Sequence, residues 1–386
     1  MKIDTTLNPL PVLTWNWLRM NKAAFSEETE YATKPATLET SDLPAGVTFT
    51  SGEASQVQEA AQIKGALGKE FDALLDEKAS QAQEAAKNQN SSQAKEAAAP
   101  FALLELPAGF KSQAPIFIRA GLQDGAASFQ RLFVKAGDNV EATIIIEWTS
   151  EKSAKGLNAF QTKIAAGNNC KIRVSTVQLL GAGFVHLNDI GCAAGENSSI
   201  EIAQLELGAQ KIYQGIRSAL SQARSSFVHN AAYCLDKDRE LDMNFIAEQT
   251  GRETKSLMNV YGTLKDGAKK TYRGTIDFRK GCAASVGNET EETLLLSQDV
   301  VNKSIPLILC DEEDVQGEHG ATIGRLDESV LFYMNARGVS EAEAQKMMAR
   351  SKIARVAALL GDDQEAQKAL DFFDASMENG ADGGNE

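Results

Sequence analysis

AGDN at residues 136–139, AGNN at residues 166–169 and AGEN at residues 194–197 each stand just before a short segment in which apolar and polar residues alternate. The glycines of the three motifs are spaced by 30 and 28 residues. Glycine and asparagine tolerate positive φ angles, so the motif predicts a tight corner at the same place in each repeat. A corner and a strand that recur at a nearly constant period predict a solenoid of parallel strands.

Alternating segments extend this pattern over residues 101–325. They lie at residues 116–118, 143–148, 171–178, 199–206, 271–278 and 293–296. A period of two is typical of strands, and few helical patterns interrupt the region, which disfavours β–α–β folds. A β-sandwich is the competing architecture. It needs hairpin turns, yet Asp124-Gly125 and Asp266-Gly267 are the main turn dipeptides of that kind here.

The regions on either side differ in composition, which divides the chain into residues 1–100, 101–325 and 326–386. An apolar period of 3.6 over residues 53–78 predicts an N-terminal helix, and residues 79–100 are typical of weak exposed helix or linker. The tryptophan pair Trp15 and Trp17 precedes this helix. We expect the pair to pack into the core, with contact to a partner as the alternative.

The last region predicts helices and ends in an acidic tail. Asp327 is a suitable N-cap for a helix to Arg337, and Gly338 is a natural left-handed stop. Ser340 and Glu343 have the spacing of a capping box that opens the next helix. The apolar face expected for that helix is Ala344, Met347, Met348, Ile353, Ala357 and Leu360. A short final helix is expected to follow.

Charge and cysteine usage exclude several classes of protein. The chain has 386 residues and a net charge of −14, which disfavours broad binding to nucleic acid or anionic membrane. The absence of an 18-residue apolar run and of an apolar leader predicts a cytoplasmic chain without a membrane helix. The five scattered cysteines predict reduced thiols, and we expect the first four to be buried: Cys170, Cys192, Cys234 and Cys282.

Motifs for common catalytic chemistry are missing. The sequence has no GxxxxGK[ST], GxGxxG, GxSxG or HExxH pattern, so we expect neither ATP hydrolysis nor another of these enzyme activities. His186 and His229 lie in apolar segments and are expected to be core residues. His319 differs, because residues 310–319 bring together Cys310, five carboxylates and this imidazole. Thiolate and imidazole suit iron and zinc, but an acidic loop with a structural histidine is the alternative.

A family resemblance rests on longer stretches. GEHGATIGRLDE at residues 317–328, LFYMNARGV at residues 331–339 and residues 342–348 resemble the C-terminal signature of the SufB/SufD family. YRGTI at residues 272–276 and the tryptophan-bearing N-terminal segment resemble the same family. The resemblance implies a right-handed parallel β-helix core, flanked by N-terminal and C-terminal helical regions.

The resemblance also implies a function. Family members are non-catalytic scaffolds of the SUF machine for iron–sulfur cluster assembly, in which SufB and SufD pair through their β-helices. A transient cluster at the pairing surface is implied, with none held stably by this chain. His319 stands where the SufD histidine stands, as the one metal ligand implied, at the subunit interface only, and Glu318 and Cys310 are expected beside it. The HGATxG form and the chain length favour SufD over SufB.

The C-terminal helices are implied to bind the SufC ATPase. The residues expected at that surface are Leu331, Phe332, Tyr333, Arg337, Gly338 and Met347. One departure from the family concerns Gly317, which stands where some SufD sequences carry a cysteine, so a thiolate beside His319 is in doubt. Two alternatives remain: a homodimeric, SufB-like sole scaffold, and a β-helix enzyme acting on acidic polysaccharide. The acidic charge and the missing export signal disfavour the enzyme.

Overall fold

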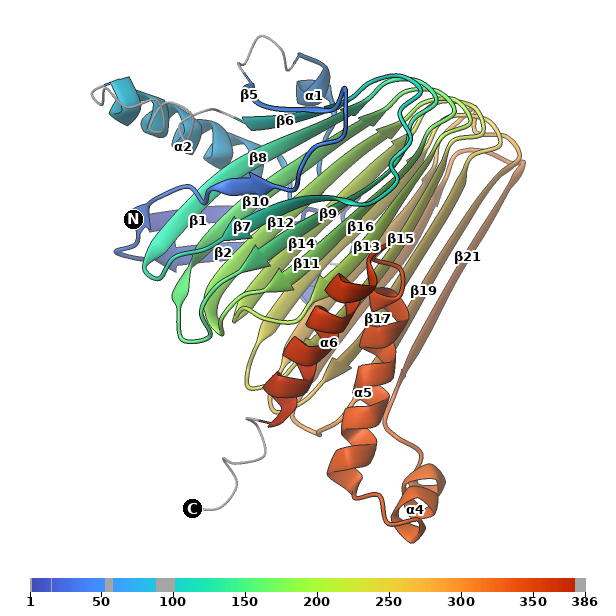
Figure 1. The fold of residues 1–386 in the computed structure, drawn as a ribbon. Coiled ribbons are helices and arrows are strands. Elements are labelled where there is room, and N and C mark those ends of the chain that lie inside the picture. Colours follow the sequence, from blue (N-terminus) through green and yellow to red (C-terminus); the bar gives the residue numbers. More distant parts are fainter. Residues whose placement is uncertain (1, 15, 53–57, 88–100, 379–386) are drawn as a thin grey trace.

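The computed structural model describes residues 2–14, 16–52, 58–87 and 101–378, and its centre is a β-solenoid (Figure 1). Each coil contributes one strand to each of two sheets, and all neighbouring strands from β6 to β21 pair in parallel. The first sheet contains β6 (Phe101–Leu106), β8 (Ala126–Ala136), β10 (Lys155–Ala166), β12 (Gly183–Ala194), β14 (Lys211–Leu220), β16 (Glu240–Gln249), β18 (Lys269–Phe278) and β20 (Val301–Cys310). The second contains β7 (Ile116–Gly121), β9 (Glu141–Thr149), β11 (Lys171–Leu179), β13 (Ser199–Glu206), β15 (Ser226–Leu235), β17 (Lys255–Leu264), β19 (Ser285–Leu295) and β21 (Val315–Gly324). The solenoid prediction is confirmed, and the sandwich alternative is excluded.

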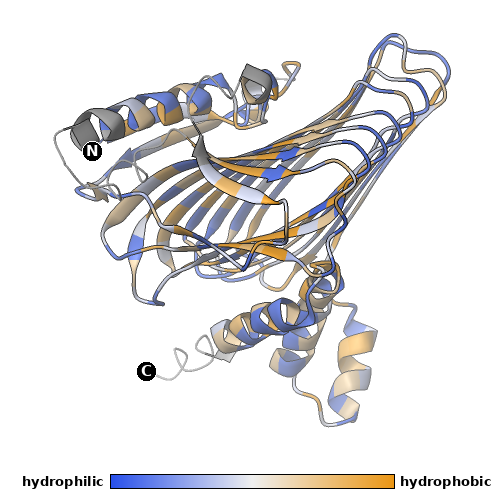
Figure 2. Cartoon of the chain, turned by 45° about the horizontal axis from the view of Figure 1, so that its top comes forward, coloured by the Kyte–Doolittle hydropathy of each residue, from blue (hydrophilic) through white to orange (hydrophobic). Residues whose placement is uncertain are grey.

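The core lies between the two sheets, where inward residues of successive coils stack in columns. One column of the second sheet begins with Ile116, Ile144, Val174 and Ile202, all buried and all paired in register. Figure 2 shows the alternation of hydrophobic and hydrophilic residues along the strands. Burial of each such side chain contributes roughly 1.5–3 kcal/mol, so the columns stabilise the stack of coils.

The repeated motif forms one corner of the solenoid, for two different reasons. Asn139, Asn169 and Asn197 have φ angles of 59°, 56° and 56°, as predicted for the corner. The glycines do not have positive φ. They are needed for close packing between coils, because a Cβ on Gly195 would lie 2.4 Å from the carbonyl oxygen of Gly167. The prediction of a tight corner is confirmed, and its explanation for glycine is wrong.

The same corner continues through the later coils without the motif. Arg224, Glu253 and Ala284 have φ angles of 57°, 57° and 60°. Backbone amides at this position donate to the next coil, as from Asn197 to Ala223 and from Arg224 to Arg252. The hydrogen bonds between coils therefore enforce the corner even where the residue type does not favour it.

The N-terminal region carries terminal helices, as predicted, and also strands that the sequence did not predict. β1 (Lys2–Leu7) and β2 (Ala23–Glu28) form an antiparallel pair. β3 (Ala32–Thr33) pairs with β8, while β4 (Leu38–Thr40) and β5 (Thr48–Gly52) pair antiparallel with β7 and β6. These last two strands close the first edge of each sheet.

The helix predicted at residues 53–78 is divided. Residues 53–57 lie outside the described ranges, and the helical parts are α1 (Gln58–Gln62) and α2 (Lys69–Lys87). Between them Gly68 has a φ of +103°, and Asp189 accepts hydrogen bonds from the amides of Ala66 and Leu67. Residues 79–87 of the expected linker belong to α2, and the rest of that segment is not described.

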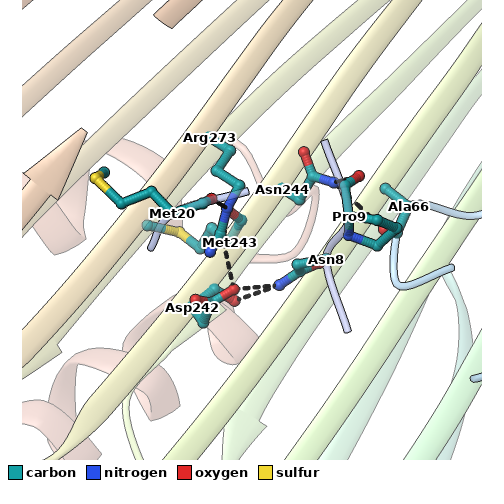
Figure 3. Close-up of polar contacts among 8 residues, drawn as sticks. All are labelled: Asn8, Pro9, Met20, Ala66, Asp242, Met243, Asn244 and Arg273. Carbon is teal, nitrogen blue, oxygen red and sulfur yellow. Dashed lines mark hydrogen bonds and ion pairs between the residues drawn. The ribbon is translucent and has the colours of Figure 1, made fainter. Parts of the chain in front are cut away.

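The segment that joins β1 to β2 crosses the outer face of the first sheet (Figure 3). The Arg273 guanidinium donates to the Met20 carbonyl at 2.6 Å and to Asp242 Oδ1 at 2.6 Å. Asn8 donates to the same carboxylate oxygen at 2.6 Å, so a buried arginine fixes the segment from both ends. The segment contains a 3₁₀ turn, η1 (Asn16–Leu18). Trp17 in that turn is 72 % exposed, so the predicted core packing is wrong for Trp17, and Trp15 is not described.

The C-terminal region consists of α4 (Glu328–Ala336), α5 (Glu341–Ala357) and α6 (Asp363–Glu378). Asp327 caps α4, Ser340 and Glu343 form the capping box of α5, and Gly338 has a φ of +85°, all as predicted. α5 packs on β13, β15 and β17, and α6 packs on β11, so both cover the outer face of the second sheet. Ala344, Ile353, Ala357 and Leu360 of the predicted apolar face are buried, as expected. Met347 and Met348 are exposed, so their assignment to that face is wrong.

The open end of the solenoid as candidate functional site

The last coil ends the solenoid with two unpaired strand edges. β20 pairs only with β18, and β21 pairs only with β19, among the strands that the structure describes. No residue of either strand is buried, and nearly all of β21 is exposed. In Figure 1 β21 lies at the far side of the stack, opposite the end that β4 and β5 close. Unpaired amides and carbonyls on such an edge favour pairing with another strand.

His319 lies on β21 at the end of an inward-facing column. In register, it follows His229, Met258 and Glu289, one residue from each of the last three coils. The inward direction follows from the neighbours, because a Cβ on Gly317 would contact the core residue Phe278, whereas one on Gly320 would meet open space. The imidazole is exposed and makes no hydrogen bond or ion pair with any described residue. It is therefore free to bind a group that arrives at the open end.

The interior changes from apolar to polar just beneath this end. Glu289, Glu291 and Thr293 face inward from β19 and are buried. Lys270 forms an ion pair with Glu291 and donates to Ser304 Oγ at 3.1 Å. Thr293 Oγ1 donates to Glu291 at 3.0 Å, so the carboxylate of Glu291 is neutralised and hydrogen-bonded.

Glu289 has no such counter-ion among the described residues, and the Tyr272 hydroxyl is a hydrogen-bonding group beside it. Its carboxylate lies across the interior against Gly274, where an added Cβ would be 2.0 Å from Oε1. Only 3 % of the residue is exposed, and Oε2 has no hydrogen-bond partner. Burial raises the pKa of Glu289 to about 7, with a hydrogen bond from Tyr272 opposing the shift and repulsion from the Glu291 charge adding to it. The YRG stretch at residues 272–274 thus places Arg273 outside, on the N-terminal segment, and leaves room inside for Glu289.

The other residues expected at this site do not lie in the inward column of the imidazole. Cys310 is exposed at the end of β20, in register with Phe278, and its thiol contacts the Glu312 carbonyl at 3.0 Å. Glu318 occupies the outward side of β21, because the strand alternates between inward Gly317 and outward Gly320. The parts of the chain that the structure describes hold no group of three His, Cys, Asp or Glu side chains that could bind a metal ion.

A second exposed region lies on α4 and the start of α5. None of the residues of α4 is buried, and its exposed side chains include Tyr333 and Phe332, the latter at 77 %, while Met347 is exposed on α5. The Arg337 guanidinium lies 5.0 Å from the Tyr333 ring centre, which is a cation–π contact. We call Val330, Phe332, Tyr333, Met347 and Met348 the α4–α5 patch. Leu331 is half-buried and Gly338, after the end of α4, is exposed. The residues expected to bind an ATPase therefore all lie on or beside α4 and the start of α5.

The remaining sequence predictions concern the core, and they are confirmed. Cys170, Cys192, Cys234 and Cys282 are free and buried. Burial lowers the pKa of His186 and of His229 to about 3, so both imidazoles are neutral core residues. His186 contacts Asn158 at 3.1 Å, and His229 contacts Gln204 at 3.2 Å.

Sequence reasoning missed Glu289, Glu291 and Lys270. The signal for the two glutamates is present in GNETEETLL at residues 287–295, where glutamates replace the inward apolar residues of earlier coils. Only the register shows which of these positions face inward.

Comparison with known proteins agrees with this geometry. Residues 117–352, more than half of the chain, match the family model described as "SUF system FeS cluster assembly, SufBD core domain". The chain belongs to the SufBD family. The match runs from β7 into α5 and thus includes every solenoid coil after β6, the open end and α4.

Relatives of this SufBD chain include two proteins named for SufD. The iron–sulfur cluster assembly protein SufD of Bacillus subtilis is 23 % identical over 253 residues, 64 % of this chain and 57 % of that protein. SufD of Escherichia coli is 23 % identical over 203 residues, 53 % of this chain and 42 % of that protein. A SufBD family protein of Staphylococcus saprophyticus is 22 % identical over 226 residues, 58 % of this chain and 49 % of that protein. The chain is most like SufD and spans about half the length of these relatives.

Within the described ranges, no helix combines the length and the apolar character needed to span a membrane. The helices of the chain instead pack against the sheets or, in the case of α4, extend away from them.

Proposed function

We propose that this chain is a non-catalytic scaffold subunit that pairs through β20 and β21 with a SufB-type scaffold and binds a SufC-type ATPase through the α4–α5 patch. The observation that carries the proposal is the open edge with an exposed, unpaired imidazole at its inward column. A strand edge of this kind is satisfied by a second solenoid, which brings further ligands to His319. Imidazole from one subunit and thiolate or carboxylate from the other suit a nascent iron–sulfur cluster.

The α4–α5 patch supports the second contact. Exposed large hydrophobic side chains that gather on one helix typically mark a protein interaction site. Figure 2 shows hydrophobic residues on these C-terminal helices. The patch lies on α4, which extends away from the sheets, and on the start of α5, whereas His319 lies on the inward column of β21, so the two proposed contacts use different residues.

Anaerobic co-purification of the tagged chain from its native host tests the proposal. We expect a SufC-type ATPase, a SufB-type scaffold, and iron with labile sulfide in the recovered complex. Recovery of the ATPase with a homodimer of this chain would favour the sole-scaffold alternative. Recovery of neither partner would overturn the scaffold function.

His319→Ala tests the role of the open end within that complex. The variant should fold and retain the ATPase, because the imidazole is exposed and has no partner among the described residues. Cluster assembly by the complex, measured as iron and labile sulfide per complex, should be lost. Full iron and sulfide content in the variant would contradict the role of His319.

A further inference from the structure

Glu289 is the inward neighbour of His319 on the coil beneath. The two residues are paired in register on β19 and β21. Registered neighbours on adjacent strands lie about 4.8 Å apart, a distance that both side chains can bridge. Because the imidazole belongs to the open coil and the carboxylate to the coil beneath, both can contact one group bound at the mouth of the interior.

The surroundings of Glu289 argue against a purely structural role. Earlier positions of the same column are apolar at Val174, Ile202 and Met258, and the one polar residue among them, His229, contacts Gln204. A buried carboxylate oxygen without a hydrogen-bond partner is rare and destabilising in a folded protein. The nearby Glu291 has its counter-ion in Lys270, so the cation of this network is already paired.

Glycine creates the space in which this carboxylate lies. Gly274 on the opposite sheet has no side chain where any other residue would collide with Glu289 Oε1. In register with Gly274, the open coil has Pro306, which carries no polar side chain that could satisfy Glu289. Oε2 of Glu289, which makes no hydrogen bond, and the exposed imidazole of His319 are therefore functional groups on adjacent coils.

We propose that Glu289 and His319 form a two-ligand half-site for a divalent cation of the Fe(II) type at the open end of the solenoid. Carboxylate and imidazole are ligands that Fe(II) accepts, and the free coordination positions face the second scaffold. The proposal rests on the proposed function, because the iron is the cargo of cluster assembly. Glu289 is assigned here as the second ligand of this chain, whereas Glu318, which faces outward, is not.

Titration of the purified full-length chain with Co(II), followed by visible absorption and equilibrium dialysis, tests the half-site. The acidic surface offers other weak sites for cations, so the Co(II) binding that His319→Ala loses is taken as the binding at the half-site. Glu289→Gln should weaken the His319-dependent binding by about tenfold or more, the scale that loss of a metal-orienting group produces. The variant with both His319→Ala and Glu289→Gln should bind Co(II) with the same affinity as whichever single variant binds it less tightly. Glu318→Gln, a carboxylate on the same strand, is the matched control and should bind like the wild type.

Glu289→Met separates ligand loss from misfolding. Methionine occupies the preceding position of the column, at Met258, so this variant should fold with a thermal midpoint at or above that of the wild type, yet lose the binding. Wild-type affinity in Glu289→Gln and Glu289→Met, or no His319-dependent Co(II) binding by the wild type at millimolar metal, would overturn the half-site. Normal cluster assembly by the Glu289 variants, with loss in His319→Ala, would leave the scaffold function intact.

Discussion

At the scale of single residues, Gly195 shows how closely the coils approach one another. A Cβ at this position would lie 2.4 Å from the Gly167 carbonyl oxygen and 2.5 Å from its carbon. Both atoms belong to the backbone and cannot rotate away, so Gly195→Ala forces the corner of two coils apart. Overpacking of this kind costs about 1–3 kcal/mol. We expect a lower free energy of unfolding by that amount, measured by urea denaturation.

Gly320→Ala is the matched control for this substitution. A Cβ at Gly320 would meet no atom within 4 Å, and the residue lies on a strand of the same solenoid. Surface changes without new contacts stay within about 0.5 kcal/mol. Equal destabilisation by the two alanines would show that the loss of glycine itself, and not the approach of the coils, decides the stability.

Asp189 is a buried carboxylate that holds the loop between α1 and α2. It accepts the amides of Ala66 and Leu67 through Oδ1 and the amide of Gln161 through Oδ2. Burial raises the pKa of Asp189 to about 6 from an ordinary value of 3.8, while these hydrogen bonds oppose the shift. The folded protein thus keeps a proton on this group that the unfolded chain releases.

The sign of the pH dependence follows from that shift. A raised pKa contributes stability that is fully present below about pH 4 and is lost as the pH rises through about 6. Asp189→Asn keeps the Oδ1 acceptor but cannot titrate. The difference in unfolding free energy, variant minus wild type, should therefore rise between pH 4 and pH 6.5 by up to about 3 kcal/mol. Urea denaturation across that range measures it, and a flat difference would contradict the raised pKa of Asp189 in the folded state.

At the scale of elements, α4 is held by its caps rather than by burial. Asp327 caps its start, and no residue of the helix is buried, so its apolar side chains are available to a partner. Phe332→Asp should leave the fold unchanged and weaken ATPase binding by at least 2 kcal/mol, the loss typical of an interface hot spot. Isothermal titration of the purified ATPase into the chain measures this loss.

Leu13→Asp controls for a general effect of placing a charge on an exposed apolar residue. Leu13 is 81 % exposed and lies in the segment across the first sheet, far from α4 in sequence and on a different face. ATPase affinity should be unchanged in this variant. Loss of affinity in Leu13→Asp, with none in Phe332→Asp, would place the ATPase on the N-terminal segment instead.

At the scale of the whole molecule, the features predicted from sequence are the repeated corners and strands. The features that were missed depend on which residues of different strands pair with one another. The asparagines at 139, 169 and 197 identify the corner because their residue type matches its φ angle. β4 and β5 are short and exist only because β7 and β6 offer edges, so local pattern does not identify them. Glu289 faces His319 through a pairing across 30 residues, and a single sequence does not contain that register.

The two proposed contacts lie on different elements, so a variant at each one can be tested against both partners. Ile323 is an apolar residue on the inward side of β21, in register with Thr293, and is 43 % exposed at the open end. Ile323→Lys places a charge where a second solenoid would bury it, and an unpaired buried charge costs several kcal/mol.

We expect Ile323→Lys to lose the SufB-type partner in pull-down and light scattering while it retains the ATPase. Phe332→Asp should show the opposite pattern, because Phe332 lies on α4, which packs on α5, whereas the pairing edge consists of β20 and β21. Loss of both partners in either variant would mean that the two contacts are coupled, and that ATPase binding requires a paired scaffold.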